Sequence, residues 1–365
     1  MKIAVLRELN EARVILTPAG VAKIKAMGVD LLVEKGAGER SYFPDEEYSD
    51  HATIVDRNQA LNEADMILSI SPLDASEWSS LKKGATMIAQ LAPFNDTEIA
   101  GKIHSKGFEA LSLDMIPRTT LAQSMDVLSS MAAVAGYRAV LTAASHLPRY
   151  FPMMITAAGS VKPATVLILG AGVAGLQAIA TARRLGAQVE AFDTRSAAKE
   201  EVKSLGAKFI EVEGAVEDKG AGGYGVEQSE DFIKRQRAEV QARAMKADVI
   251  ITTAQVRGRK APVLVPTTTV DKMRPGSVII DLASSTGGNC ELSKDREVVI
   301  HNGVSIIGDS DLSATMPQDS SLLYSNNVVN FINILIKEGE LNLDATNEII
   351  RGAWITAPAI ETDKD

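Results

Sequence analysis

The sequence is poor in cysteine, in aromatic residues and in long hydrophobic runs. Its only cysteine, Cys290, excludes an internal disulfide and a cysteine-rich zinc site. Near the first residue, Arg7 and Glu8 interrupt the opening apolar run before it reaches the length of a signal peptide. Both absences are typical of a cytoplasmic protein, and we expect that location.

Several familiar kinds of site are also missing. The histidines stand far apart without the H-E-x-x-H spacing of zinc enzymes, and no G-x-S-x-G motif of serine hydrolases occurs. With 38 basic and 47 acidic residues the formal net charge is −9, and no block of like charge forms a tail. We therefore expect no metal site and no nucleic-acid partner.

What is present is the composition of a folded protein, since 45% of the 365 residues are hydrophobic and 23% are charged. This length predicts more than one domain. Short apolar runs alternate with helical patterns, which predicts βα units and mostly parallel sheets. The expected strands are 3–6, 31–34, 66–70, 87–91 and 108–112 in a first series, and 165–169, 188–192, 249–253, 277–281 and 304–307 in a second.

The pattern predicts an α/β protein with two Rossmann-like, doubly wound parallel-sheet domains joined by long helices. We expect residues 1–128 and 313–365 to form a first, flavodoxin- or Rossmann-like domain, and residues 129–312 to form a second, Rossmann domain. An Ala-rich helix at 124–145 is expected to connect the domains. An apolar helix at 320–337 is expected to return to the first domain, which makes that domain discontinuous.

The apolar segment 164–182 is about as long as a membrane span, but glycines interrupt it in the form G-x-G-x-x-G, at Gly170, Gly172 and Gly175. An apolar run precedes the motif, a helical pattern follows it, and Asp193 ends the next expected strand. Together they predict a strand, a tight turn and a helix whose N-terminus binds the pyrophosphate of a dinucleotide. Asp193 would accept hydrogen bonds from ribose hydroxyls.

Arg195 follows Asp193 by two residues and bears on the choice of dinucleotide. The carboxylate would repel a 2′-phosphate, which favours NAD over NADP. An arginine could accommodate that phosphate, but beside Asp193 we expect it to pair locally or to lie along the adenine. The other dinucleotide contacts expected near this edge are Val173, Thr194 and Ala254.

A polar, glycine-rich stretch at 213–228 contains Tyr224 and four acidic residues. Loops of this length inside a compact domain are often functional, which predicts a mobile loop. A disordered surface insertion is the alternative, and both interpretations remain open at this stage.

A second group of candidate residues lies around the start of the 124–145 helix. Gln123 and Asp126 are three residues apart and are therefore expected on one helix face, with Ser129 one turn further and Arg118 in the preceding loop. This spacing fits a helix start with a surface Arg–Asp pair as well as a binding site.

Five segments carry a family resemblance. Segments 13–18, 118–138, 170–175, 191–195 and 281–290 resemble the alanine dehydrogenase and nicotinamide nucleotide transhydrogenase superfamily, over essentially the whole chain. The segment 117–132, PRTTLAQSMDVLSSMA, is similar to the Arg-Gln-Asp loop of the NAD(H)-binding component of proton-translocating transhydrogenase.

The resemblance implies roles for particular residues. Those implied to contact the nicotinamide end of NAD(H) are Arg118, Gln123, Asp126 and Ser129, with Gln123 nearest to the ring. Tyr224 would fold over the bound nucleotide as part of a lid, and Gln236 would be a further nucleotide contact.

The resemblance also implies partners. It implies a homodimer, an NADP(H)-binding domain and a membrane-embedded subunit, so that the protein lies peripherally on the inner face of the membrane. Hydride would pass directly between NADH and NADP⁺, which requires the reacting carbons to approach to about 3–3.5 Å with water excluded.

Alanine dehydrogenases, which are similar over the same length, provide the main alternative function. They use an arginine, a lysine and a histidine on a 2-oxo acid, which needs a cation and a proton donor. Arg13 matches the arginine, but Ser69 and Ser71 stand at the expected places of the lysine and Gln90 at that of the histidine. This disfavours an amino-acid dehydrogenase. A module that only senses NADH is the other alternative, and the group at 118–129 argues against it.

Overall fold

The structure is a computed structural model that describes residues 1–212 and 229–358. The chain divides into two compact units, and each is described by itself. Unit 1 comprises Met1–Met131 and the chain from Ala314 onward, and unit 2 comprises Ala132–Ser313. Unit 1 is therefore built from two separate stretches of sequence.

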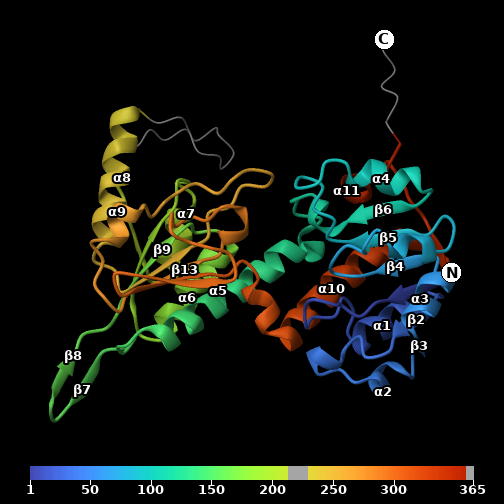
Figure 1. Ribbon diagram of the computed structural model, residues 1–365, viewed down its shortest axis with the longest axis horizontal. Coiled ribbons are helices and arrows are strands. Elements are labelled where there is room, and N and C mark those ends of the chain that lie inside the picture. Colours follow the sequence, from blue (N-terminus) through green and yellow to red (C-terminus); the bar gives the residue numbers. More distant parts are fainter. Residues whose placement is uncertain (213–228, 359–365) are drawn as a thin grey trace. The chain divides into compact units, whose positions relative to one another are not determined.

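Unit 1 is organised around a six-stranded sheet in the order β3-β2-β1-β4-β5-β6 (Figure 1). All its strand pairs are parallel. The strands are β1 (Lys2–Val5), β2 (Asp30–Glu34), β3 (Thr53–Val55), β4 (Met66–Leu68), β5 (Thr86–Ala89) and β6 (Glu109–Ser112). The order reverses between β1 and β4, which is the mark of a doubly wound sheet.

Helices cover the sheet of unit 1. They are α1 (Pro18–Lys25), α2 (Asp45–Tyr48), α3 (Arg57–Glu63), α4 (Ile99–Ser105), α10 (Pro317–Leu335) and α11 (Glu348–Ala353), and a short pair, β16 (Ile336–Lys337) and β17 (Glu340–Leu341), follows α10. Thr17 caps α1, since its Oγ1 accepts from the N–H of Gly20 at 3.4 Å. The α10 helix lies against this start, because Ser325 Oγ accepts from the N–H of Thr17 at 3.1 Å.

Unit 2 contains a seven-stranded sheet in the order β11-β10-β9-β12-β13-β15-β14. Its strands are β9 (Thr165–Leu169), β10 (Gln188–Phe192), β11 (Lys208–Phe209), β12 (Val249–Thr252), β13 (Val278–Asp281), β14 (Glu297–His301) and β15 (Val304–Gly308). Only β14 is antiparallel to its neighbour. The β9 side chains alternate between two buried clusters, which explains its uninterrupted apolar sequence.

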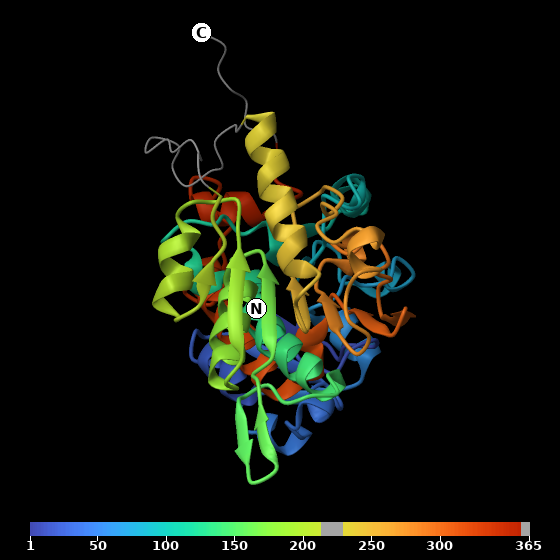
Figure 2. The ribbon, with the colours of Figure 1, turned by 90° about the vertical axis from the view of Figure 1, so that its left-hand side faces the viewer.

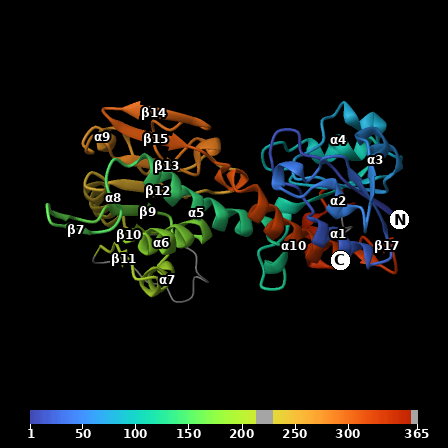
Figure 3. The same ribbon diagram turned by 90° about the horizontal axis from the view of Figure 1, so that it is seen from below.

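Helices cover both faces of this second sheet (Figure 3). Buried residues of α5 (Val127–His146), α6 (Val173–Arg184) and α7 (Ala198–Ser204) share one cluster with the sheet. Those of α8 (Glu230–Ala244) and α9 (Thr267–Val270) share the other. A separate hairpin of β7 (Met154–Thr156) and β8 (Gly159–Val161) extends away from the sheet of unit 2 (Figure 2).

The predicted fold class, an α/β protein with doubly wound parallel sheets, is confirmed, but three strands of the two large sheets were not predicted from the sequence. The strands β3 and β11 have three and two residues, too few for a periodicity to emerge. The edge strand β14 carries only the short apolar run 298–300, and it is largely exposed, so it lacks the burial that shaped the longer apolar sequences of the central strands.

The helix expected at 124–145 is interrupted, which corrects the sequence analysis. A short 3₁₀ helix, η4 (Gln123–Met125), precedes α5, and Asp126 between them has φ −76° and ψ 91°. Its carboxylate accepts from the backbone N–H of Ser129 at 2.9 Å, the geometry of a helix N-cap. Gln123 and Asp126 are therefore not on one face of a single α-helix.

Two segments have the hydropathy of a membrane span. Segment 164–182 forms β9, the glycine turn and most of α6, as the glycines predicted. Among described helices, α5 is long and apolar enough to cross a membrane by length and composition, a property that core helices of soluble proteins share. Ala139, Val140 and Ala143 of α5 are fully buried in the core of unit 2.

Candidate functional site

The glycine turn between β9 and α6 occupies the position that the sequence predicted. Gly170 has φ +104°, a conformation that favours glycine, and a Cβ there would lie 2.5 Å from Thr253 Oγ1. A Cβ at Gly175 would lie 1.9 Å from the carbonyl oxygen of Gly170. Backbone conformation and close contacts within the protein therefore explain why positions 170 and 175 are glycines.

Gly172 differs from both because none of the described residues requires a glycine there. Its backbone is ordinary and extended, with φ −76° and ψ −168°, and a Cβ would meet no atom of the described residues within 4 Å. This open position lies at the N-cap of α6. A group that approaches the backbone from outside is what a side chain at 172 would obstruct, so the turn fits a bound pyrophosphate.

The N-terminus of α6 has hydrogen-bond donors available for such a group. Gly172 provides no side-chain cap, whereas side chains of Thr17, Asp56 and Ser229 cap α1, α3 and α8. Uncapped first-turn N–H groups and the partial positive charge of the helix end favour an anion. Val173, the first residue of α6, is 45% exposed despite its apolar side chain, so the start of the helix is open to a ligand.

Asp193 lies at the end of β10 and joins this turn to the next loop. Its Oδ2 accepts from the N–H of Ala171 at 2.8 Å, and Oδ1 accepts from the N–H of Arg195 at 2.8 Å. The guanidinium of Arg195 donates to both carboxylate oxygens, each at 3.0 Å. The local Asp193–Arg195 pairing that the sequence favoured is thus present.

The ion pair changes the electrostatics of this edge. Burial by itself raises the pKa of Asp193, but the hydrogen bonds from Arg195 and from the Ala171 N–H outweigh burial and hold the pKa below its usual value. The carboxylate is therefore ionised at neutral pH, and the adjacent guanidinium offsets its charge. Repulsion of a 2′-phosphate is correspondingly weaker than Asp193 alone would provide.

The loop after β12 is held by a residue for which the sequence analysis assigned no role. Asn289 is fully buried; its Oδ1 accepts from the N–H of Ala254 at 3.0 Å, and its Nδ2 donates to the carbonyls of Ala254 and Pro262 at 2.9 and 2.8 Å. Nearby, the buried Asp281 carboxylate accepts from the N–H of Cys290 at 2.9 Å. The motif Gly-Gly-Asn-Cys at 287–290 was the available signal.

The remaining predicted residues of unit 2 make no further contact with this edge that the structure shows. Thr194 is exposed in the loop after β10, and Gln236 lies partly buried on α8. Tyr224 lies outside the described residues. The glycine turn, Asp193, Arg195 and Ala254 are thus the residues brought together around the carboxyl ends of β9, β10 and β12.

The second predicted group belongs to unit 1. Arg118 and Gln123 are exposed, and Asp126 and Ser129 are partly buried. Ser129 Oγ donates to Asp126 Oδ2 at 2.7 Å, in addition to the capping bond from its N–H. No ion pair joins Arg118 to Asp126 in the described part of the chain, so the surface Arg–Asp pair is wrong and the carboxylate faces the start of α5.

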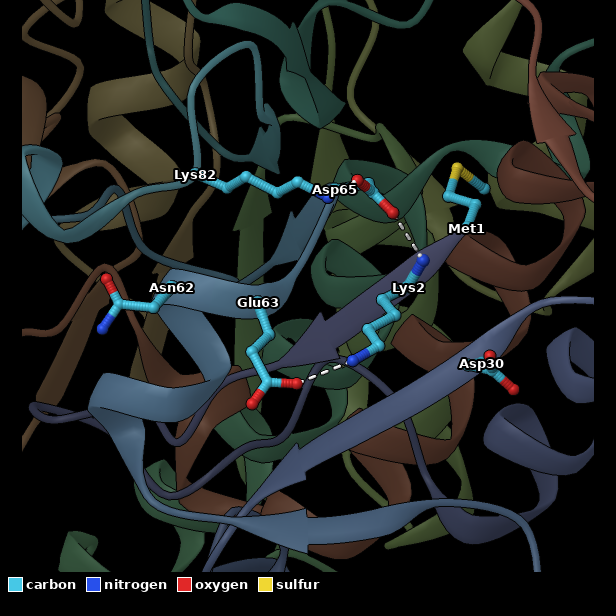
Figure 4. Close-up of a pocket in the computed structure, with 7 residues that line it drawn as sticks. All are labelled: Met1, Lys2, Asp30, Asn62, Glu63, Asp65 and Lys82. Carbon is cyan, nitrogen blue, oxygen red and sulfur yellow. Dashed lines mark hydrogen bonds and ion pairs between the residues drawn. The ribbon is translucent and has the colours of Figure 1, made fainter.

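A cavity of about 530 Å³ in unit 1 lies elsewhere (Figure 4). It is lined by Met1, Lys2, Asp30, Asn62, Glu63, Asp65 and Lys82, at the amino ends of β1, β2 and β4. Ligands of parallel α/β sheets bind at the opposite, carboxyl edge. Its charged side chains are paired, Lys2 with Glu63 at 2.7 Å and Lys82 with Asp65 at 2.5 Å inside the lining, and Asp30 with Lys25 at 2.9 Å beside it. Among described residues, no group of three metal-ligating side chains occurs.

Comparisons with known proteins identify the family. The model of the alanine dehydrogenase/PNT N-terminal domain matches residues 4–135, and that of the C-terminal domain matches residues 139–360. The chain therefore belongs to the alanine dehydrogenase/PNT family.

Individual relatives distinguish the two branches of this family. The chain is 41% identical to an NAD(P) transhydrogenase subunit alpha polypeptide of Rhodospirillum rubrum, over 98% of this chain and 96% of that protein. A crystal structure of transhydrogenase from Sinorhizobium meliloti matches with a TM-score of 0.89 and 41% identity, over 97% of this chain and 98% of that one. Alanine dehydrogenase of Mycolicibacterium smegmatis is 28% identical, over 90% of this chain and 85% of that protein.

These similarities confirm the predicted resemblance. The chain is an oxidoreductase component of the transhydrogenase alpha-subunit type, and the alanine dehydrogenase alternative is not favoured.

Proposed function

We propose that this chain is the NAD(H)-binding component of a proton-translocating transhydrogenase, and that it passes hydride directly between NADH and NADP⁺ held on a partner domain. The observation that carries the proposal is the open glycine turn, where Gly172 has no reason within the protein to be a glycine. The similarity to transhydrogenase alpha subunits supports the same reaction.

In unit 2, the chain would bind and orient the dinucleotide. The first-turn N–H groups of α6 would hold the pyrophosphate, and Asp193 would accept hydrogen bonds from the ribose of the adenosine half. Val173, Thr194 and Ala254 would line the same edge. Arg195 would remain paired with Asp193 or turn toward the adenine.

In unit 1, Arg118, Gln123, Asp126 and Ser129 would contact the nicotinamide end. The exposed position of Gln123 on η4 supports this role, because a side chain that meets a partner-bound nucleotide cannot be buried. Tyr224 would close over the nucleotide, and Gln236 would supply a further contact. The nicotinamide supplies the hydride chemistry, and the protein supplies position and water exclusion.

The contacts of Arg13 support transhydrogenation over oxidation of an amino acid. Its guanidinium is bound by the carboxylate of Glu11, with Nη2 donating to Oε1 at 2.9 Å, and both side chains are nearly buried. The carboxylate of a small substrate would have to displace this internal one. Ser69 and Gln90 offer no replacement for a lysine and a histidine.

The decisive experiment follows nicotinamide absorbance in two stages. Purified protein and NADH are first given pyruvate with ammonium, and then a recombinant NADP(H)-binding partner domain with NADP⁺. We expect oxidation only after the partner is added. Oxidation by pyruvate and ammonium alone would mean an amino-acid dehydrogenase, and binding of NADH without oxidation in either stage would mean a sensor.

The role of Gln123 has its own test. We expect Gln123→Asn to slow hydride transfer to the partner-bound NADP⁺ far more than it weakens NADH binding, since a shortened side chain misplaces the ring without removing the pyrophosphate and ribose contacts. Gln59→Asn on the exposed side of α3 is the matched control. Equal transfer rates in wild type and Gln123→Asn would remove Gln123 from the mechanism.

The assembly includes a homodimer that attaches to the inner face of the membrane through its partners. The β7–β8 hairpin supports the dimer, because Met153, Ile155 and Val161 in and beside it are 59%, 76% and 39% exposed and a lone two-stranded hairpin is marginal in water. Sedimentation should give twice the chain mass, and Ile155→Asp should lower it. Ile300→Asp, on the exposed edge strand β14, should not.

A further inference from the structure

The turn that carries Gln123 has one buried side and one exposed side. In η4 and its flanks, Ala122 is fully buried and Met125 is 8% exposed, while Gln123 and Ser124 face solvent. A 3₁₀ helix has three residues per turn, so residues 122 and 125 share a side. The buried pair anchors the turn and projects Gln123 outward.

The α10 helix holds this turn through its backbone. The side-chain amides of Asn327 and Asn330 both donate to the carbonyl oxygen of Ser124, at 2.8 and 3.1 Å. The two asparagines are three residues apart and therefore lie on the same side of α10. They hold the backbone of the residue directly after Gln123, although more than 200 positions of sequence separate the two segments.

The α10 helix, which carries both asparagines, is packed firmly into unit 1. Val328, Phe331 and Ile332 of α10 are fully buried, and Ser321 Oγ accepts from the N–H of Val14 at 2.9 Å. On the other side of the turn, Asp126 caps α5. The carbonyl of Ser124 is thus tied to a rigid element, and the turn is held at both ends.

Protein stability alone does not explain why position 327 is an asparagine. It is 7% exposed, and its Oδ1 has no hydrogen-bond partner within the described structure. A buried acceptor without a partner is unfavourable, and an apolar side chain of similar size would avoid it. The Nδ2 donation to Ser124 is the contact that such a replacement would lose.

We infer that Asn327, assisted by Asn330, is a positioning residue for hydride transfer that fixes the backbone of η4 and thereby the place of Gln123. The inference rests on the proposed role of Gln123 at the nicotinamide. A displacement of about 1 Å in a group that aligns reactants can slow a reaction by about a hundredfold. The hydrogen bonds from Asn327 and Asn330 to Ser124 prevent such a displacement, although neither asparagine contacts the nucleotide.

The test compares Asn327→Leu, Asn327→Asp and the neighbouring, exposed Asn326→Leu, all in the full chain with the partner domain. We expect the first two to slow transfer from NADH to partner-bound NADP⁺ by about tenfold or more while the Kd for NADH changes less than twofold. Asn326→Leu should leave both unchanged. Asn327→Leu should also keep the Tm of the wild type, because it removes the unpaired Oδ1.

A double variant separates failure of this inference from failure of the proposed function. If Asn327 acts through Gln123, adding Asn327→Leu to Gln123→Asn should slow transfer little further. Fully additive effects, a normal rate in Asn327→Leu, or a joint fall of rate, NADH affinity and Tm would overturn the inference. A normal rate in Gln123→Asn alone would remove Gln123 from the mechanism and this inference with it, whereas an absence of transfer from the wild-type chain to partner-bound NADP⁺ would overturn the proposed function.

Discussion

Among single residues, Asp193 already accepts four hydrogen bonds from the protein, one from Ala171 and three from Arg195. In the proposed binding mode, a ribose hydroxyl would have to share these oxygens or displace the guanidinium. Arg195 would then affect both the nucleotide affinity of this edge and its charge.

Substitutions of the two members of this ion pair should change the dinucleotide selectivity in opposite directions. We expect Asp193→Ala to weaken NADH binding and to reduce the preference over NADPH, because the ribose loses its acceptor. We expect Arg195→Ala to increase that preference, because the unpaired carboxylate repels a 2′-phosphate. Calorimetry with both nucleotides checks this, and unchanged selectivity in both variants would mean that the ribose is read elsewhere.

Cys290 provides a second test at this scale. Burial, with a smaller contribution from the nearby Asp281 carboxylate, raises the pKa of the thiol to about 11. The thiolate is the reactive form, so the native protein should resist a disulfide reagent at pH 8 and react once unfolded. Because the folded pKa is the higher one, the contribution of this thiol to stability is complete below about pH 8.5 and is lost as the pH rises toward 11. Fast native labelling at pH 8 would contradict the burial.

At the scale of elements, α5 and α6 approach each other closely beside the glycine turn. A Cβ on Gly136 of α5 would lie 2.1 Å from the carbonyl oxygen of Ala174, in the first turn of α6. The helix end that is proposed to hold the pyrophosphate is therefore seated directly on another helix, within unit 2.

Gly136→Ala should displace that helix end. We expect it to destabilise the protein by about 1–3 kcal/mol, as overpacking does, and to weaken NADH binding. Gly101→Ala in α4 is the control, since a Cβ there meets nothing within 4 Å and alanine should stabilise the helix by up to about 1 kcal/mol. Thermal unfolding and NADH titration of both variants decide the matter. A tolerated Gly136→Ala would mean that α5 and α6 can separate freely.

At the scale of the whole molecule, the residues proposed to bind the pyrophosphate and the ribose belong to unit 2, and those proposed to contact the nicotinamide belong to unit 1. NADH at a hundred times its Kd should stabilise the folded protein by about 2.7 kcal/mol. Hydrogen exchange should slow in β9, α6 and β12 of unit 2, and in unit 1 chiefly over 118–131. Protection spread evenly over unit 1 would argue that its sheet, rather than the 118–131 segment, meets the nucleotide.

The sequence by itself determined those features that depend on neighbouring residues. Strand and helix patterns, the Thr17 cap and the glycine turn follow from local periodicity, backbone conformation and spacing. The same reasoning could have identified Asp126 as the N-cap of α5, because aspartate directly before an apolar helical pattern is a preferred N-cap residue. The helical pattern of 124–145 concealed it.

Only the tertiary structure decided the contacts between distant parts of the chain. The hydrogen bond from Asn327 to Ser124 and the three hydrogen bonds of Asn289 depend on which elements pack together. Each is a directed hydrogen bond whose partner is fixed by packing rather than by spacing in sequence. Candidate functional residues can therefore be identified from the sequence, whereas the residues that hold them in position can be identified only from the folded structure.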